Sequence, residues 1–375
     1  MPGDVSAVIF EGIAAGGPVE KMVAGVRRAA LLDNLEKLKQ VSLIDAVYLV
    51  TNDGELAELA RTENVRVFLN DLPPSSFHFG AALRDLIVDR KLKKVFYLSG
   101  AGCPLITVSE IISICRRLQE RDNLVYTNNT QSADIVAFHV PDRIAEAELP
   151  PMDNALAMTL RDQLGLEQEL MPHTLGLLFD LDTPSDILVL GGSPFGGPRT
   201  REAIKGLDLD YSTLNRAKAV LAGSYQEVAL MGRVGAPVME RLNSTLKLRL
   251  RVFSEERGMK SLGRLQSGEV VSLMGYLIQE AGIPAFFRYL SQVARCAFID
   301  TRVLMAHHKF AFSTEERFKS DLGLWKEIQH PWLREFTREA VSCPIPVILG
   351  GHSLVSGSLW ALSLELDPAG GGPCL

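Results

Sequence analysis

The stretch SAVIFEGIAAGGPVEKMVAGVRRAALLDNLEKLKQVSLIDAVYLVT, residues 6–51, decides the fold. It opens with a short apolar run at 6–10, and a glycine-bearing loop at 12–17 follows. Apolar residues then recur at helical spacing over 19–39, and a second apolar run occupies 46–51. Because strand, helix and strand alternate in this order, the stretch predicts a βαβ unit with two parallel strands.

The same alternation continues through the first half of the chain. The patterns predict helices at 56–64, 79–90 and 153–164, and strands at 65–69, 94–99, 134–139 and 174–179. Short runs rich in β-branched residues that alternate with amphipathic helices are typical of a parallel sheet covered on both faces. We therefore expect an α/β fold with a doubly wound, mostly parallel, Rossmann-like sheet.

A loop rich in glycine and proline at 191–198 predicts a boundary between two domains, residues 1–192 and 199–375. Beyond it, strands are expected at 228–231, 248–253, 293–300 and 346–349, with helices at 262–280 and 333–341. The second domain is therefore also expected to be α/β.

Composition narrows the class of protein. With 47% hydrophobic residues and a net charge of -6 without any basic block, the chain has enough apolar surface for two cores and no duplex-binding surface. No apolar run is long enough to cross a membrane. The five cysteines are odd in number and contain no C-x-x-C pair, which indicates neither zinc nor a disulfide framework. We expect a cytoplasmic protein with no membrane or nucleic-acid partner.

Two segments of the first half could carry chemistry. Gly16, Gly17 and Lys21 lie between the first strand and its helix, where backbone N–H groups can hold a phosphate; a plain turn with a solvated lysine is the alternative. Asp180 and Asp182 lie two apart at the end of a predicted strand, so they share a face and could meet a divalent cation. Alternatively, these carboxylates only cap the helix that starts near Pro184.

The order of these segments resembles that of the MobA-like nucleotidyltransferases, a family that includes the 2-phospho-L-lactate guanylyltransferases. The matching pieces are the Gly16-Gly17 loop with Lys21, the segment from Gly102 to Leu105, and the D-x-D-T-P-x-D segment at 180–186. The resemblance implies a magnesium-dependent enzyme that joins a nucleoside monophosphate, taken from a nucleoside triphosphate, to a phosphorylated acceptor and releases pyrophosphate.

The same resemblance implies roles for particular residues. The nucleotide would be held by Gly16, Gly17, Lys21, Asn70 and Gly102, the catalytic residues would be Lys21 and Asp182, and Asp182 with Asp180 would bind Mg²⁺.

This chain departs from the family pattern at two places. Pro18 and Glu20 stand in the loop where the family has a further glycine and a basic residue, and Gly102 stands where it has its first metal-binding aspartate. Either another carboxylate replaces the missing one, with Asp71 as a candidate, or the protein binds a nucleotide or nucleotide sugar without catalysis. A glycosyltransferase is a third reading.

The second half contains a candidate anion site. Arg233, Arg257 and Arg302 follow three separate predicted strands, so they could converge at one sheet edge, although each alone is typical of a surface arginine. Gly351 and Ser353 follow a fourth strand and could cradle a phosphate. A serine hydrolase is excluded, because Val355 replaces the second glycine of G-x-S-x-G and no histidine follows Ser353. We expect an anionic small molecule there.

Overall fold

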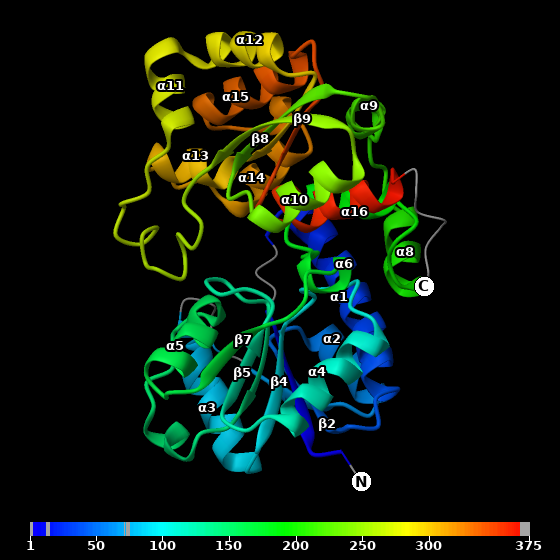
Figure 1. Ribbon diagram of the computed structural model, residues 1–375, viewed down its shortest axis with the longest axis vertical. Helices are drawn as coiled ribbons and strands as arrows, with labels where there is room; N and C mark the ends of the chain where they lie inside the picture. The colour runs from blue at the N-terminus through cyan, green and yellow to red at the C-terminus, as the bar shows by residue number, and fades with distance from the viewer. Residues whose placement is uncertain (1–2, 13–15, 71, 73–75, 368–375) are drawn as a thin grey trace.

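The computed structural model describes residues 3–12, 16–70, 72 and 76–367, and it consists of two lobes, each built around its own sheet (Figure 1). The lower lobe in Figure 1 contains the N-terminal half of the chain, and the upper lobe contains the C-terminal half. The α/β class with a mostly parallel first sheet and a second α/β unit is confirmed.

The first sheet has seven strands in the order β3-β2-β1-β4-β6-β5-β7. Its strands are β1 (Val5–Glu11), β2 (Ile44–Thr51), β3 (Arg66–Leu69), β4 (Lys94–Ser99), β5 (Leu124–Thr127), β6 (Ile135–His139) and β7 (Glu167–Leu170). All neighbours pair in parallel except β6, which runs antiparallel to both β4 and β5. The start of β6 therefore lies at the same edge as the ends of the other strands.

Helices cover both faces of this sheet. Alternate residues of β1 show the division: Val5, Ala7 and Ile9 belong to the apolar cluster under α1, whereas Val8 belongs to the cluster under α3. The helices of this half are α1 (Pro18–Lys39), α2 (Gly54–Thr62), α3 (Phe79–Arg90), α4 (Val108–Glu120), α5 (Leu156–Asp162), α6 (Leu175–Leu178) and α7 (Pro184–Gly191). This arrangement makes the first sheet doubly wound.

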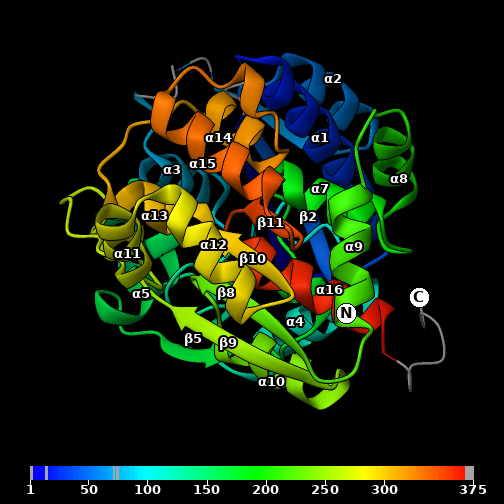
Figure 2. The same ribbon diagram turned by 90° about the horizontal axis from the view of Figure 1, so that it is seen from above.

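The second sheet has four parallel strands in the order β11-β10-β8-β9 (Figure 2). The strands are β8 (Gln226–Gly232), β9 (Leu248–Ser254), β10 (Cys296–Asp300) and β11 (Val347–Gly350). The helices are α8 (Pro198–Lys205), α9 (Ser212–Leu221), α10 (Ala236–Thr245), α11 (Leu273–Ala281), α12 (Ile283–Val293), α13 (Thr301–His307), α14 (Thr314–Asp321), α15 (Pro331–Ser342) and α16 (Gly357–Glu365). Here too the strand order reverses, between β8 and β10.

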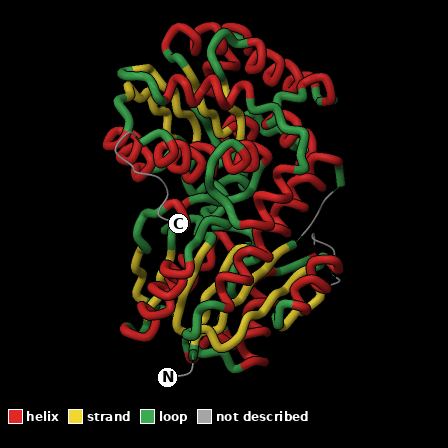
Figure 3. The backbone as a smooth tube through the Cα atoms, turned by 90° about the vertical axis from the view of Figure 1, so that its right-hand side faces the viewer, coloured by secondary structure: helices red, strands yellow, loops and turns green. Residues whose placement is uncertain are grey.

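The two lobes lie against each other (Figure 3) and share apolar packing. One continuous cluster of buried side chains runs from the α1 face of the first sheet, through α7, to Val228 and Leu230 of the second. Buried polar contacts reinforce it: Ser185 of α7 donates to the Leu349 carbonyl in β11, and Ser358 of α16 donates to Asp186 at 3.0 Å. A single apolar core therefore holds the two sheets in a fixed position relative to each other.

Two expected elements differ in the structure. Residues 174–179 form the short helix α6 rather than a strand, because the Thr174 hydroxyl accepts from the Leu177 N–H and caps a helical turn. Asp180 and Asp182 consequently follow a helix and not a strand. The helix expected at 262–280 begins only at Leu273, because Gly263 and Gly268 adopt positive φ and the preceding segment wraps around Arg264, which pairs with Glu256.

Smaller differences concern boundaries and omissions. The expected strand at 293–300 begins at Cys296, because α12 continues to Val293. The patterns missed α4, β5 and β7 altogether. No helix in the described part of the chain is long and apolar enough to cross a membrane.

Candidate functional site

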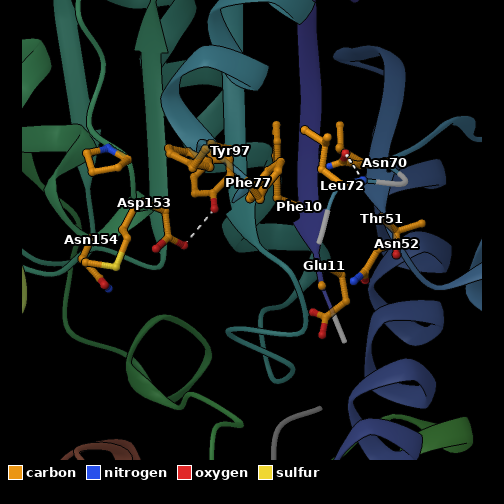
Figure 4. Close-up of a pocket in the computed structure, with 15 residues that line it drawn as sticks. Phe10, Glu11, Thr51, Asn52, Asn70, Leu72, Phe77, Tyr97, Asp153 and Asn154 are labelled. Atoms are coloured by element: carbon orange, nitrogen blue, oxygen red, sulfur yellow. Dashed lines mark hydrogen bonds between the residues drawn. The ribbon is translucent and has the colours of Figure 1, made fainter. Parts of the chain in front are cut away.

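A cavity of about 370 Å³ opens at the edge of the first sheet where the strand order reverses between β1 and β4 (Figure 4). At such a point the loops after neighbouring strands diverge to opposite faces, and ligands of doubly wound sheets bind there. We call it the sheet-edge cavity. Its lining includes Glu11 at the end of β1, Thr51 at the end of β2, and Asn70 after β3. The volume suits a small molecule.

One wall of the sheet-edge cavity is aromatic and the opposite end is polar. The rings of Phe10 and Phe79 contact each other edge to face at 5.1 Å, and Tyr97 and Phe79 do so at 5.2 Å. The Tyr97 hydroxyl donates to Asp153 at 2.9 Å, and Asn154 follows next in the chain. Flat apolar rings beside amides and carboxylates can bind a planar heterocycle and its polar substituents.

Three carboxylates lie beyond this polar end. Asp180 and Asp182 follow α6, and Asp134 immediately precedes β6. Gly102 lies against them: a side chain built there would begin 3.5 Å from the Asp134 Cβ and 3.5 Å from an Asp180 oxygen. Asp134 and Asp180 therefore both lie next to the position at which Gly102 lacks a side chain. Asp71, which the sequence suggested as a replacement, lies outside the described residues.

Each of these carboxylates changes the pKa of its neighbours. Burial and the nearby charges of Asp182 and Asp153 raise the pKa of Asp134 to about 7. Burial, Asp182 and Asp134 likewise raise the pKa of Asp180 well above its usual value. Burial also disfavours the ionised form of Asp182, but Arg27 and Lys260 outweigh it and lower the pKa of that carboxyl. Burial and mutual repulsion thus favour the neutral forms of Asp134 and Asp180, and a bound cation would favour their ionised forms.

Arg27, which the sequence analysis did not single out, forms an ion pair with this cluster. Its guanidinium binds Glu11 with two bonds of 2.9 Å, donates to the Leu181 carbonyl and reaches Asp182 at 3.3 Å. Glu11 is almost fully buried and also accepts from the Ala101 N–H. Gly100 has a φ of +53°, and a Cβ there would overlap the Glu11 carboxylate. Arg27 therefore ties the end of β1 to the segment that carries Asp182.

The loop that was expected to bind phosphate already holds carboxylates. Glu20 accepts from the N–H groups of Gly16 and Gly17. Glu315 of α14 reaches across from the upper lobe and accepts from the N–H groups of Val19 and Glu20 at 3.1 and 3.0 Å. The helix N-terminus thus binds anions, and the anions in this structure belong to the protein itself. Lys21 is exposed in the first turn of α1.

A second cavity, of about 460 Å³, lies between the lobes and is called here the inter-lobe cavity. Asp134, Asp180 and Asp182 line it from below, and the edge of the second sheet lines it from above. Asn154 borders both cavities, so the two are neighbours. The edges of two sheets therefore face each other across a common space.

The upper wall of the inter-lobe cavity is basic, but much of its charge is neutralised. Arg233 pairs with the fully buried Asp300 at 2.6 Å, and Arg302 pairs with Asp321 through both terminal nitrogens. Arg257 lies in smaller pockets beside Arg233 and His352, where burial and Arg233 lower its pKa. The three arginines thus gather at one edge, although Arg257 does not line the same cavity as Arg302.

Gly351 and Ser353 lie at the junction of the lobes. Gly351 lines the inter-lobe cavity, where a Cβ would approach a Thr183 methyl at 2.9 Å. The Ser353 hydroxyl donates to the Asp180 carbonyl at 2.6 Å and accepts from the Asp180 N–H at 3.2 Å. Ser353 is buried and so positions Asp180. Asn70 lines the sheet-edge cavity, where its side-chain oxygen accepts from the Leu72 N–H.

Among the described residues, no three side chains of histidine, cysteine, aspartate or glutamate are placed to hold a metal ion together. The four described cysteines are free and buried.

No protein-family model matches the chain, and no curated protein matches it by sequence. Similar solved structures include a protein from Desulfovibrio desulfuricans assigned as a nucleotide-diphospho-sugar transferase (15% identity, TM-score 0.41, covering 54% of this chain and 94% of that one). A cytidylyltransferase from Leptospira borgpetersenii (16%, TM-score 0.39, 54% and 93%) and a nucleotidyl transferase from Methanothermobacter (14%, TM-score 0.35, 49% and 94%) are also similar. Similarity this low says nothing about the activity of this chain.

Proposed function

We propose that this protein transfers a nucleoside monophosphate from a nucleoside triphosphate to an anionic small-molecule acceptor, with release of pyrophosphate. The observation that carries the proposal is the placement of two neighbouring cavities, one at the edge of the first sheet and one lined by Asp134, Asp180 and Asp182 on one side and by arginines of the other lobe on the other. The order of motifs that resembles the MobA-like family supports the same reaction.

The nucleoside would occupy the sheet-edge cavity. The aromatic wall at Phe10 and Tyr97 offers apolar contact to a base, and the side chains of Thr51, Asn70 and Asn154 offer hydrogen bonds. The triphosphate would then extend from β1 toward Asp182, which lies at the start of the inter-lobe cavity.

The carboxylates fit a magnesium ion. Mg²⁺ is commonly held by one or two carboxylates together with substrate phosphates and water, so a full protein cage is not required. Asp182 and one neighbouring carboxylate, Asp134 or Asp180, would supply the protein's oxygen ligands, and the pKa values of Asp134 and Asp180 are raised by burial and by the negative charge of their neighbours. When bound, the ion would offset the charge that builds up on the phosphates during transfer. Arg27 orients Asp182 toward this role.

The N-terminus of α1 would contact the triphosphate only after a rearrangement. Gly16, Gly17 and the first turn of α1 present N–H groups that Glu20 and Glu315 occupy. A phosphate oxygen would compete with Glu315 for the same donors, and Lys21, one turn away, could then add its charge.

The binding of Glu20 and Glu315 to the N-terminus of α1 also favours a second function, which is nucleotide binding without transfer. If the carboxylates of Glu20 and Glu315 stay in place, the protein binds a nucleoside or nucleotide sugar in the sheet-edge cavity without transferring it. Gly102, in place of an aspartate, agrees with this alternative.

A thermal-shift panel separates the two functions. The four ribonucleoside triphosphates, their diphosphates and several nucleotide sugars are each added with and without Mg²⁺, because a ligand that binds the folded state raises its stability. Transfer predicts a shift by one triphosphate that requires Mg²⁺ and disappears in Asp182→Asn. Shifts that are independent of Mg²⁺, or that only nucleotide sugars produce, would refute it.

A further inference from the structure

Arg317 of α14 forms no salt bridge with any carboxylate among the described residues, although the charges of Asp321 and Glu20 act on it from farther away. It lines the inter-lobe cavity, its Nη2 donates to the Thr314 hydroxyl at 2.9 Å, and its Nε is buried without a hydrogen-bond partner among the described residues. Burial and the charge of Arg302 lower its pKa. A partly desolvated guanidinium is costly unless an anion pairs with it.

Lys260 is the second such cation. It lies on the long loop after β9, lines the same cavity and forms no direct salt bridge with any described residue, although its charge acts on Asp182 and Asp134. Arg233 and Arg302, by contrast, pair directly with Asp300 and Asp321. Figure 1 shows this loop, in yellow-green, descending from the upper lobe toward the lower one. Its Gly258 approaches Gln131 of the lower lobe closely. Lys260 is therefore carried to the cavity by a loop that bridges the lobes.

The cavity between these two cations also has an apolar wall. The wall residues come from the loop after β9, from α13, from the segment that follows it and from α14, and they are Met259, Leu265, Met305, Phe310, Phe312 and Phe318. Ring contacts fix the wall: Phe310 contacts Trp332 at 5.2 Å, and Phe312 contacts His330 at 4.8 Å. Inorganic phosphate would leave this wall uncovered, whereas a ligand with a carbon body would bury it.

We propose that the inter-lobe cavity is the acceptor site, and that the acceptor is an amphiphilic phosphate or similar anion whose charged group binds Arg317 and Lys260 while its apolar body packs on Phe310 and Phe312. The assignment as acceptor rests on the proposed function. The binding site itself stands on the unpaired cations and the apolar wall, so it can be tested without nucleotide.

The test is calorimetric titration of the full chain with hexyl phosphate and with inorganic phosphate, in the absence of nucleotide. Hexyl phosphate is expected to bind at least about tenfold more tightly, because its chain covers apolar side chains. Arg317→Gln and Lys260→Gln are each expected to weaken it about tenfold, through loss of a charge-assisted bond. Phe312→Leu should weaken hexyl phosphate and leave inorganic phosphate unchanged.

Arg338→Gln, an exposed arginine on α15, is the matched control and should bind like the wild type. Lys260 is exposed, so its variant stays informative if Arg317→Gln does not fold. Equal affinities for the two phosphates would overturn the apolar part of the proposal. Unchanged affinity in the Lys260 variant, or no binding of hexyl phosphate, would overturn the site as a whole. Because no nucleotide is present, either result leaves the thermal-shift test of nucleotide binding unaffected.

Discussion

Asp134 lies directly beside Gly102, with its Cβ 3.5 Å from the point at which a side chain on residue 102 would begin. The two residues belong to different segments, one before β6 and the other after β4, which pair antiparallel. Gly102 has no carboxylate to offer after β4, but Asp134, just before the neighbouring strand β6, provides one close by. In the proposed function, Asp134 would supply the oxygen ligand that Gly102 cannot.

Asp134→Asn should change how stability depends on pH. The folded-state pKa of Asp134 is about 7 against an unfolded value of 3.8, so its stabilising contribution is complete below about pH 4 and is lost as the pH rises through 7. Between pH 5 and pH 8 in EDTA, the free energy of unfolding of the variant should improve relative to the wild type by roughly 1–2 kcal/mol. Urea unfolding at each pH measures this free energy. Asp85→Asn, an exposed control on α3, should follow the wild type; an identical curve for Asp134→Asn would contradict the coupled cluster.

Arg27→Met should destabilise the protein strongly. It leaves the Glu11 carboxylate buried at 3% exposure with the Ala101 N–H as its remaining donor in the described contacts. Removing one partner of a buried pair costs about 3–5 kcal/mol. The same unfolding titration measures the loss, and Arg61→Met, whose partner Glu58 is exposed, should change it by less than about 1 kcal/mol. A loss as small as that of the control would show that Arg27 does not hold this edge together.

Glu315→Gln should lower the stability of the protein but raise its affinity for the nucleotide. The neutral amide caps α1 less well, so stability should fall by about 0.3–1 kcal/mol. Affinity for the triphosphate that the thermal-shift panel selects should rise severalfold, because phosphate no longer competes with a carboxylate for the N–H groups of Val19 and Glu20. Calorimetry measures the affinity, with the exposed Glu280→Gln as control. Unchanged or weaker binding would place the triphosphate elsewhere.

The sheet could be predicted from sequence because its signals are local. The apolar run at 94–99 and the helical pattern at 79–90 coincide with β4 and α3. The strand predicted at 174–179 was wrong. The Thr174 hydroxyl caps a helical turn there, whereas the apolar content of the segment alone predicts a strand.

The site was less predictable, because its central contacts join residues far apart in the chain. Asp134 meets Gly102 only across paired strands, Arg27 is one of many arginines on helices, and Glu315 approaches α1 from the other lobe. The arginines after β8, β9 and β10 follow strands that end at one sheet edge, which the parallel alternation of strands and helices indicates from sequence. Their pairing with Asp300 and Asp321 depends on tertiary packing that no local pattern records.

The proposal that Asp134 and Asp182 bind Mg²⁺ is tested most directly by a Mg²⁺ titration in the presence of the preferred triphosphate. The titration is carried out at pH 6.5 and pH 8 for the wild type, Asp134→Asn and Asp182→Asn. If these carboxylates hold the ion, wild-type affinity should increase with pH as Asp134, with its pKa of about 7, loses its proton, and both variants should bind Mg²⁺ at least about tenfold more weakly. Equal Mg²⁺ affinity in all three proteins, at both pH values, would contradict the account.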